Sequence, residues 1–330
     1  MQHDITGWLR TLTDDPPEGY ESGLRYFLGG AYNGLSFSLT SRYPLGTNVF
    51  QREWDLLLVL DACRVDALKA VAPEYDWIDS VDSMWSVGSS SHEWLCKTFT
   101  GKYADEIAET GYISSNPHTR PTFIDGARPP QKYITPVTWA DWDVVDEDQI
   151  GLLRYLSHDH EYSEYFDTLP PDIVTDHTIE AGRTGNLERI VAHYFQPHRP
   201  HIAGPYREAR RLSDVEDRPW RAIQTGAASK AEVWQNYLDN LRLVLNSIER
   251  LRENIDAQRV VITADHGELF GELGQYGHPE GFVHPKLKKV PWATTTATDS
   301  GTSTPAIEHN DDPSPSDSEV TERLEQLGYL

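Results

Sequence analysis

Residues 259–272 read RVVITADHGELFGE and join a strand pattern directly to a cluster of ionisable side chains. Residues 260–262 form a run of β-branched apolar residues, which is typical of a strand buried on both faces of a parallel sheet. Asp265 and His266 follow at the carboxyl end of this strand, where open α/β sheets bind ligands. The stretch indicates either part of a metal site or a polar turn in which Asp265 or Glu268 caps the next helix.

A second strand pattern ends in the same way. Residues 55–60, DLLLVL, form a continuous apolar run that meets Asp61 and then Arg64, and a helix-like stretch covers residues 65–71. Asp61 is a candidate helix cap. However, two apolar strands that each deliver a carboxylate to one sheet edge favour a metal-ligand role for Asp61 and Asp265.

A run of serines lies between the two strands in sequence. Residues 86–101 read SVGSSSHEWLCKTFTG, so Ser89, Ser90 and Ser91 follow a glycine and precede an amphipathic helix pattern. Hydroxyls and backbone N–H groups at a helix N-terminus bind anions and are suited to carrying an activated nucleophile. The alternative is an ordinary serine N-cap.

Two histidines follow a further apolar strand. Residues 190–195 predict this strand, and it runs into a proline-bounded loop that contains His198 and His201. Such a loop is suited to contact with a metal or an oxyanion. Residues 112–116 predict another strand, and residues 230–254 predict a long packing helix from their helical spacing of apolar residues.

The late loop combines histidines with lysines, which are scarce elsewhere in the chain. His278 and His284 are followed by Lys286, Lys288 and Lys289. This grouping predicts a local positive patch for an anionic group, although a solvated loop is the alternative. A last strand pattern begins at residue 290.

Composition narrows the classes of partner. The chain has 330 residues and a formal net charge of -23, and most of its basic residues are arginine. This balance suits high salt, where charge repulsion is screened, and it argues against nucleic acid or anionic lipid as partners for the surface as a whole. The two cysteines, together with the lack of a signal peptide or a membrane-span pattern, predict a protein of a high-salt cytoplasm. The oligomeric state stays open.

The chain divides into four predicted parts around one α/β domain. Residues 1–50 form an N-terminal extension with a short helix at residues 5–12, and residues 51–295 form the domain itself. Residues 117–171 predict an insertion or lid, because they are rich in Pro, Trp and Asp without periodicity. Residues 296–318 predict a disordered Ser/Thr/Pro/Asp linker, and residues 319–330 a short helix.

These motifs together resemble the alkaline phosphatase-like superfamily, which includes sulfatases, nucleotide pyrophosphatase/phosphodiesterases and lipoteichoic acid synthases. The resemblance covers residues 55–293 and is greatest to the sulfatase-like proteins of salt-loving archaea. It implies a sandwich with a central, mostly parallel sheet flanked by helices. It also implies one metal held by Asp61, Asp265 and His266. Counting back from the family's Thr-Gly at residues 100–101 implies Ser91 as nucleophile and metal contact, with Ser89 and Ser90 as alternatives.

The resemblance further implies that His198 and His278 contact the substrate or a second metal. The family pattern leaves Glu268 without a metal, so it is expected to support its neighbours or cap a helix. Two family features are absent. Ser91 lacks the proline and arginine context of formylglycine sulfatases, and His198 with His201 does not reproduce the Asp-x3-His spacing of two-zinc phosphatases.

The predicted function is a metal-dependent hydrolase or transferase of phosphate or sulfate esters. A divalent ion (Mn, Zn, Ca or Mg), at one site or two, would activate the Ser91 hydroxyl for in-line attack on a small anionic ester or glycan. His198, His278 and Arg64 are assigned to charge stabilisation and catalysis. His201, His284 and Lys286 are assigned to substrate binding. The alternatives are a degenerate protein that binds anionic glycans or metabolites, and a transferase acting on cell-surface polymers.

Overall fold

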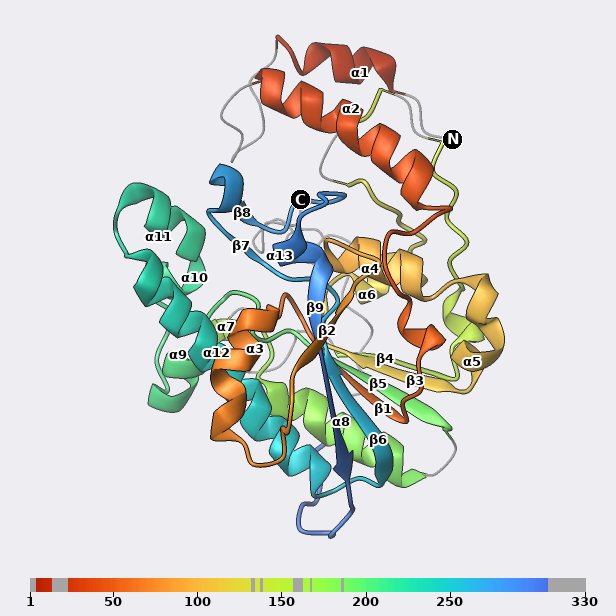
Figure 1. Cartoon of the computed structure of the whole chain (residues 1–330), viewed down its shortest axis with the longest axis vertical. Coiled ribbons are helices and arrows are strands. Elements are labelled where there is room, and N and C mark those ends of the chain that lie inside the picture. The colour runs from red at the N-terminus through yellow and green to blue at the C-terminus, as the bar shows by residue number, and fades with distance from the viewer. Residues whose placement is uncertain are drawn as a thin grey trace.

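Seven strands form the central sheet in the order β2-β9-β6-β1-β5-β3-β4 (Figure 1). This computed structural model describes residues 4–13, 23–131, 134–136, 139–156, 163–166, 168–184 and 187–307. The strands of the sheet are β1 (Leu56–Leu60), β2 (Asp82–Trp85), β3 (Thr110–Ser114), β4 (Leu152–Tyr155), β5 (Arg189–Tyr194), β6 (Ala257–Thr263) and β9 (Lys289–Ala297). Two short strands, β7 (Leu269–Phe270) and β8 (Tyr276–Gly277), pair separately.

The predicted α/β class and mostly parallel sheet are confirmed. Strand β1 is parallel to both β5 and β6, and β3 is parallel to both β5 and β4, whereas β9 runs antiparallel to β6 and β2. All five residues of β1 are buried, as its unbroken apolar run predicts for a strand covered on both faces. The carboxyl ends of β6, β1, β5 and β3 therefore meet at one edge.

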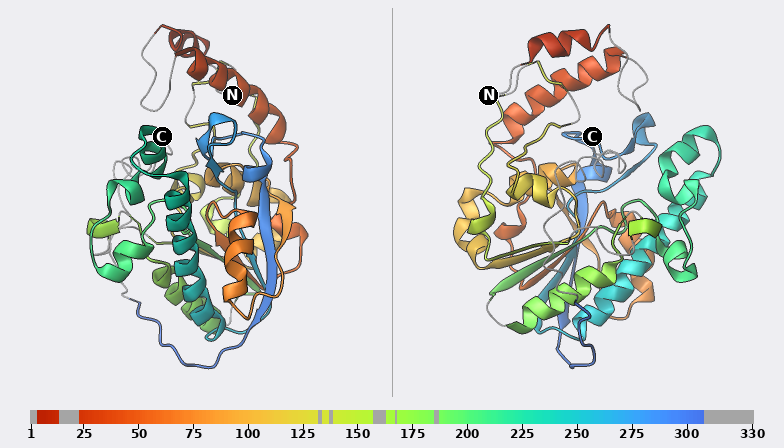
Figure 2. Two further views of the ribbon diagram at one scale, coloured as in Figure 1. Left: turned by 60° about the vertical axis from the view of Figure 1, so that its left-hand side comes forward. Right: turned by 180° about the vertical axis from the view of Figure 1, so that it is seen from behind.

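Helices cover both faces of this sheet (Figure 2). The long helix α12 packs with α8 and α3 on one face, and α4 and α6 pack together on the other side. The α-helices are α1 (Ile5–Arg10), α2 (Gly23–Thr40), α3 (Val65–Val71), α4 (Ser91–Thr98), α5 (Ala104–Ala108), α6 (Thr119–Phe123), α7 (Ser163–Phe166), α8 (Pro171–Thr184), α9 (Ala203–Glu208), α10 (Asp214–Asp217), α11 (Pro219–Thr225), α12 (Lys230–Arg252) and α13 (Pro285–Lys288).

Local sequence explains the best-predicted helices. Helix α3 spans the predicted residues 65–71, and α12 falls within the predicted 230–254. At the start of α12 the Ser229 side chain accepts a hydrogen bond from the backbone N–H of Glu232, which is the expected serine cap. The apolar spacing of α12 buries Leu241, Val244 and Leu245 against the sheet layer.

The sequence predicted no helix at α2. Gly29, Gly30 and Gly34 interrupt this segment, and glycine is unfavourable inside a helix. In the structure α2 lies beside α1, and the two occupy the end of the molecule away from α8 and α12 (Figure 1). Stacking of Trp8 on Phe27, with ring centroids 3.8 Å apart, joins the two helices. Among the described helices, none is long and apolar enough to cross a membrane.

The structure differs from the sequence prediction in the insertion and in the linker. Strand β4 lies within residues 117–171, so part of the expected insertion or lid is an edge strand of the sheet. The expected disordered linker at 296–318 is ordered at its start, because β9 runs to Ala297 and the N–H groups of Thr298 and Ser300 donate to the carbonyl groups of Arg252 and Glu253. The helix predicted for residues 319–330 lies outside the described residues.

Candidate active site

Asp61, Asp265 and His266 converge at the carboxyl edge of the sheet. Asp61 directly follows β1, and Asp265 and His266 come after the neighbouring strand β6. One oxygen or nitrogen atom from each side chain lies within 4.8 Å of those of the other two, and all three residues are buried. The three residues predicted from two separate strand ends are therefore in one cluster.

The backbone around this cluster is held closely. The N–H groups of Ala62 and His266 donate to Asp265 Oδ1 at 3.1 and 2.8 Å. Ala62 has a φ of 60°, a left-handed conformation that is uncommon for a residue with a side chain. The hydroxyl of Tyr237, from α12, donates to the Ala62 carbonyl group at 2.7 Å and so fixes this turn. The packing helix thus helps to position the site.

The two carboxyl groups differ in their tendency to ionise. Burial raises the pKa of Asp61 well above its usual value, and the charges of Asp265 and Glu268 raise it further. Burial also opposes ionisation of Asp265. Nevertheless, His266 and His193 hold the pKa of Asp265 below its usual range. Burial and neighbouring charges thus disfavour ionisation of Asp61, whereas the neighbouring histidines favour ionisation of Asp265.

His266 is oriented as a ligand. Its Nδ1 lies 2.8 Å from the carbonyl oxygen of Gly267, and because a carbonyl oxygen only accepts, Nδ1 carries the hydrogen. The Nε2 lone pair then faces Asp61 Oδ1 at 3.5 Å and Asp265 Oδ2 at 3.4 Å. A buried set of two carboxylates and one imidazole, oriented by a backbone carbonyl, fits a divalent cation.

Gly267 permits the close approach of two chain segments. A β-carbon at this position would lie 2.1 Å from the Lys286 carbonyl oxygen, and the Gly267 N–H donates to the Leu287 carbonyl group at 2.7 Å. No helix follows, since the chain enters β7 at Leu269. The expectation that Asp265 or Glu268 caps a helix here is therefore wrong.

Among the three serines, Ser91 is the one in contact with the cluster. Its Oγ lies 3.4 Å from Asp61 Oδ2 and 3.2 Å from His266 Nε2. The Ser89 hydroxyl instead donates to Glu93 Oε2 at 2.7 Å, and the Ser90 Oγ has no hydrogen-bond partner among the described residues. Ser91 is also the first residue of α4.

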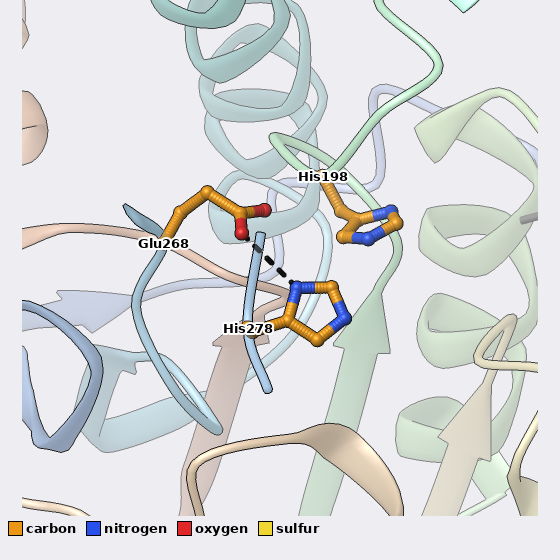
Figure 3. A group of neighbouring side chains, drawn as sticks. All are labelled: His198, Glu268 and His278. Atoms are coloured by element: carbon orange, nitrogen blue, oxygen red, sulfur yellow. Dashed lines mark hydrogen bonds and ion pairs between the residues drawn. The ribbon is translucent and has the colours of Figure 1, made fainter. Parts of the chain in front are cut away.

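A second group adjoins the first, and Figure 3 shows the side chains of this second group. It consists of His198, Glu268 and His278, and His278 Nδ1 lies 3.1 Å from Glu268 Oε1. The rings of His266 and His278 have centroids 4.5 Å apart, so the two groups share a boundary. Burial raises the pKa of Glu268 to about 8. The structure thus gives Glu268, which was expected to support its neighbours or cap a helix, a place in a second candidate metal group.

The sequence did not identify two residues that contact the first cluster. Asn116, which follows β3, donates from Nδ2 to Asp61 Oδ2 at 2.8 Å. His193, within β5, places Nε2 3.7 Å from Asp265 Oδ2, and the Tyr112 hydroxyl lies 2.8 Å from its Nδ1. A histidine inside an otherwise apolar strand was the available signal for His193.

A third side chain approaches from the same loop as Asn116. His118 is buried and stacks on His92, with ring centroids 5.0 Å apart. Burial lowers the pKa of His118 well below its usual value, and His92, His278 and His266 lower it further. His92 directly follows Ser91 in α4. The two stacked rings are therefore close neighbours of the cluster.

Arg64 and Lys286, which were predicted as site residues, form ion pairs with residues outside the two clusters. Arg64 pairs with Asp66 at 2.7 Å and Glu272 at 2.9 Å and donates to the Glu268 carbonyl oxygen at 3.1 Å. Lys286 pairs with Asp66 at 2.6 Å. These contacts hold the loop after Glu268, and the assignment of Arg64 to catalysis stays a prediction.

The predicted positive patch does not form. Lys286 is half-buried and paired, Lys288 is buried, and Lys289 is exposed on β9. Burial lowers the pKa of Lys288 to about 8, although the nearby Glu93 favours its charge. The three lysines therefore do not share one surface.

The remaining two predicted histidines lie outside both groups. His284 is the N-cap of α13, where its Nδ1 accepts a hydrogen bond from the Lys286 N–H at 3.1 Å. His201 is buried against Tyr237, with ring centroids 6.2 Å apart. Neither belongs to the two candidate metal groups of the described residues.

Comparison with known proteins gives matches among solved structures. No family model matches the sequence, and no curated protein matches it. Among solved structures, the integral membrane lipooligosaccharide phosphoethanolamine transferase A from Neisseria meningitidis is similar with a TM-score of 0.46 and 13% identity, over 73% of this chain and 47% of that chain. This chain thus spans about half the length of that protein.

Two further structures are similar at the same level. The soluble domain of the Neisseria meningitidis transferase has a TM-score of 0.44 and 12% identity, over 78% of this chain and 80% of that chain. A phosphonate monoester hydrolase from Silicibacter pomeroyi has a TM-score of 0.37 and 15% identity, over 84% and 73%. The α/β fold of this chain is established by its own strand order and register.

Proposed function

We propose that this protein is a metal-dependent hydrolase or transferase of phosphate or sulfate esters and that Ser91 is its nucleophile. One observation carries the proposal: a serine hydroxyl lies 3.4 Å from Asp61 Oδ2 and 3.2 Å from His266 Nε2, inside a buried group that fits a divalent cation. A simple serine N-cap does not need two buried carboxyl groups and an imidazole beside it.

The chain's own residues account for each part of this proposal. Asp61, Asp265 and His266 would hold a divalent ion, which when bound lowers the pKa of a neighbouring hydroxyl and neutralises anionic charge. Asn116 keeps the Asp61 carboxyl group in place through its 2.8 Å hydrogen bond. The start of α4 adds the positive end of a helix dipole beside the anionic ester.

The reaction proceeds by substitution at phosphorus or sulfur. The Ser91 hydroxyl loses its proton to solvent, and its oxygen bonds to phosphorus or sulfur as the bond to the leaving alcohol breaks. The leaving alkoxide takes a proton from solvent. Water or an acceptor alcohol then attacks the phosphorus or sulfur of the serine ester, the bond from that atom to the Ser91 oxygen breaks, and this oxygen regains a proton as the attacking group loses one. Attack by water gives hydrolysis, and attack by an alcohol gives transfer.

The second group would bind either another ion or the oxygens of the ester. His198 and His278 offer ring nitrogens to the ion or to the ester oxygens. Glu268 can bind a cation only when its carboxyl group is ionised. Burial raises the pKa of Glu268 to about 8, so a cation at this group would displace a proton near neutral pH. His198 and His278 thus keep their predicted roles in charge stabilisation.

The test is an ester panel with two serine variants. Aryl phosphate monoesters, phosphodiesters and sulfate esters are assayed in concentrated salt with Mn²⁺, Zn²⁺, Ca²⁺ or Mg²⁺. Ser91→Ala should abolish turnover and keep the thermal stabilisation produced by metal. Ser90→Ala is the matched control, because it removes the neighbouring hydroxyl, which has no partner among the described residues. This control should keep most of the activity.

Two results would contradict the proposal. Undiminished turnover by Ser91→Ala would remove the assigned nucleophile. A wild-type protein that binds metal stoichiometrically but turns over no ester of the panel would favour a protein that binds anionic glycans or metabolites without catalysis.

A further inference from the structure

Helix α2 carries a row of exposed apolar side chains. Leu24, Leu28, Tyr32, Leu35 and Leu39 follow one another at spacings of four, four, three and four, which places them on one side of a helix. They are 45–65% exposed. We call these five residues the apolar face. A contiguous exposed row of this kind marks an interaction surface.

The opposite side of α2 is fixed to the protein. Phe37 is fully buried beside Trp142, with ring centroids 5.6 Å apart, and a β-carbon at Gly30 would lie 2.2 Å from the Ile134 carbonyl oxygen. The helix therefore cannot rotate its leucines inward. The apolar face can be covered only by something outside the described chain.

Helix α1 also exposes apolar side chains. Ile5 and Leu9 lie on α1, and Leu12 follows its end, and these residues are 45–51% exposed. Both helices lie together at one end of the molecule (Figures 1 and 2). Eight of the exposed large apolar side chains of the described residues thus lie on or beside these two helices.

Charge identifies the kind of partner. The chain has 52 acidic residues and a net charge of -23, yet neither α1 nor α2 contains Asp or Glu, and none occurs anywhere in residues 23–52. Carboxylates are costly where a helix enters the boundary between lipid headgroups and acyl chains.

We propose that α1 and α2 dock the protein on the surface of a lipid bilayer through the apolar face. An interfacial helix buries its apolar side in the headgroup boundary, and the other side of α2 packs on the protein itself. The Tyr32 hydroxyl donates to the Gly281 carbonyl group at 2.9 Å, so α2 is attached to the loop that carries His278. Docking therefore brings this loop close to the membrane.

The test is flotation with phosphatidylcholine vesicles at about 1 M KCl, where the Debye length is about 3 Å. Wild type should float with the vesicles. Leu28→Asp/Leu35→Asp should bind the vesicles at least about tenfold more weakly, because each change removes a leucine that the lipid would bury. The matched control is Ile124→Asp, at an apolar residue that is 41% exposed and lies outside α1 and α2, and it should float like wild type.

Two further measurements distinguish docking on lipid from unfolding of the variant and from self-association of the protein. Thermal unfolding checks that the double variant remains folded, as expected for substitutions of exposed residues. Sedimentation without lipid measures self-association. The proposal is overturned if wild type fails to float, or if wild type is a dimer that the double variant converts to a monomer. Neither measurement requires turnover, so a failure here is distinct from a failure of the ester panel.

Discussion

Replacing Asp61 with asparagine should stabilise the metal-free protein and remove its response to metal. Asp61 is fully buried, and the charges of Asp265 and Glu268 oppose its ionisation. An effective penalty of several kcal/mol for a buried charge is partly offset by the bonds from Asn116 and Ser91. Asparagine keeps the shape and the hydrogen bond from Asn116. We therefore expect a gain of about 1–3 kcal/mol in unfolding free energy at neutral pH.

The pH dependence of this gain has a definite sign. Because the folded-state pKa of Asp61 is raised, its ionisation lowers stability as the pH rises above the ordinary value of 3.8. The difference between Asp61→Asn and wild type should therefore be near zero below that pH and grow above it. Without Asp61 the cluster has lost one of its two carboxylates, so added metal should no longer stabilise the protein.

The assay is urea denaturation followed by tryptophan fluorescence, first with chelator and then with metal. At one hundred times its dissociation constant, a bound ion should stabilise wild type by about 2.7 kcal/mol. The reasoning is refuted if Asp61→Asn is less stable than wild type in chelator. It is equally refuted if metal stabilises the variant as much as it stabilises wild type.

Three further changes test other parts of the structure. Glu93→Ala leaves the buried Lys97 ammonium group without its 2.5 Å partner, so it should cost about 3–5 kcal/mol by urea denaturation, and the double change Glu93→Leu/Lys97→Met should cost less. Glu268→Gln should flatten the pH profile of unfolding in chelator, because the raised pKa makes wild type lose stability from pH 4.5 up to about 8; an unchanged slope would contradict the shift. Leu58→Ala, at a fully buried position of the central strand, should cost about 2–5 kcal/mol, and a cost under about 1 kcal/mol would argue against the described core.

The sequence predicted the centre of the sheet and the first cluster because both follow from local patterns. Continuous apolar runs predicted β1 and β6 as doubly covered strands, and parallel strands bring their carboxyl ends together. Asp61 and Asp265 therefore met where expected. The choice of Ser91 over its two neighbours came from family spacing, and the structure brings Ser91 to within 3.4 Å of the cluster.

Residues whose partners come from distant segments were not predictable in this way. Glu268 is grouped with His198, which lies on the loop after β5, and no local pattern links the two. Arg64 was predicted to assist catalysis, but its partners include Glu272, more than 200 residues later. Asn116 appears locally as a turn residue before proline, whereas its partner Asp61 is on another strand.

The most direct test of the central claim is anomalous X-ray scattering from crystals of the protein soaked in Mn²⁺ or Zn²⁺. The account predicts a metal peak within bonding distance of Asp61, Asp265, His266 and the Ser91 hydroxyl. A fully occupied metal that contacts none of these four residues, or an empty cluster in crystals that bind the ion elsewhere, would contradict it.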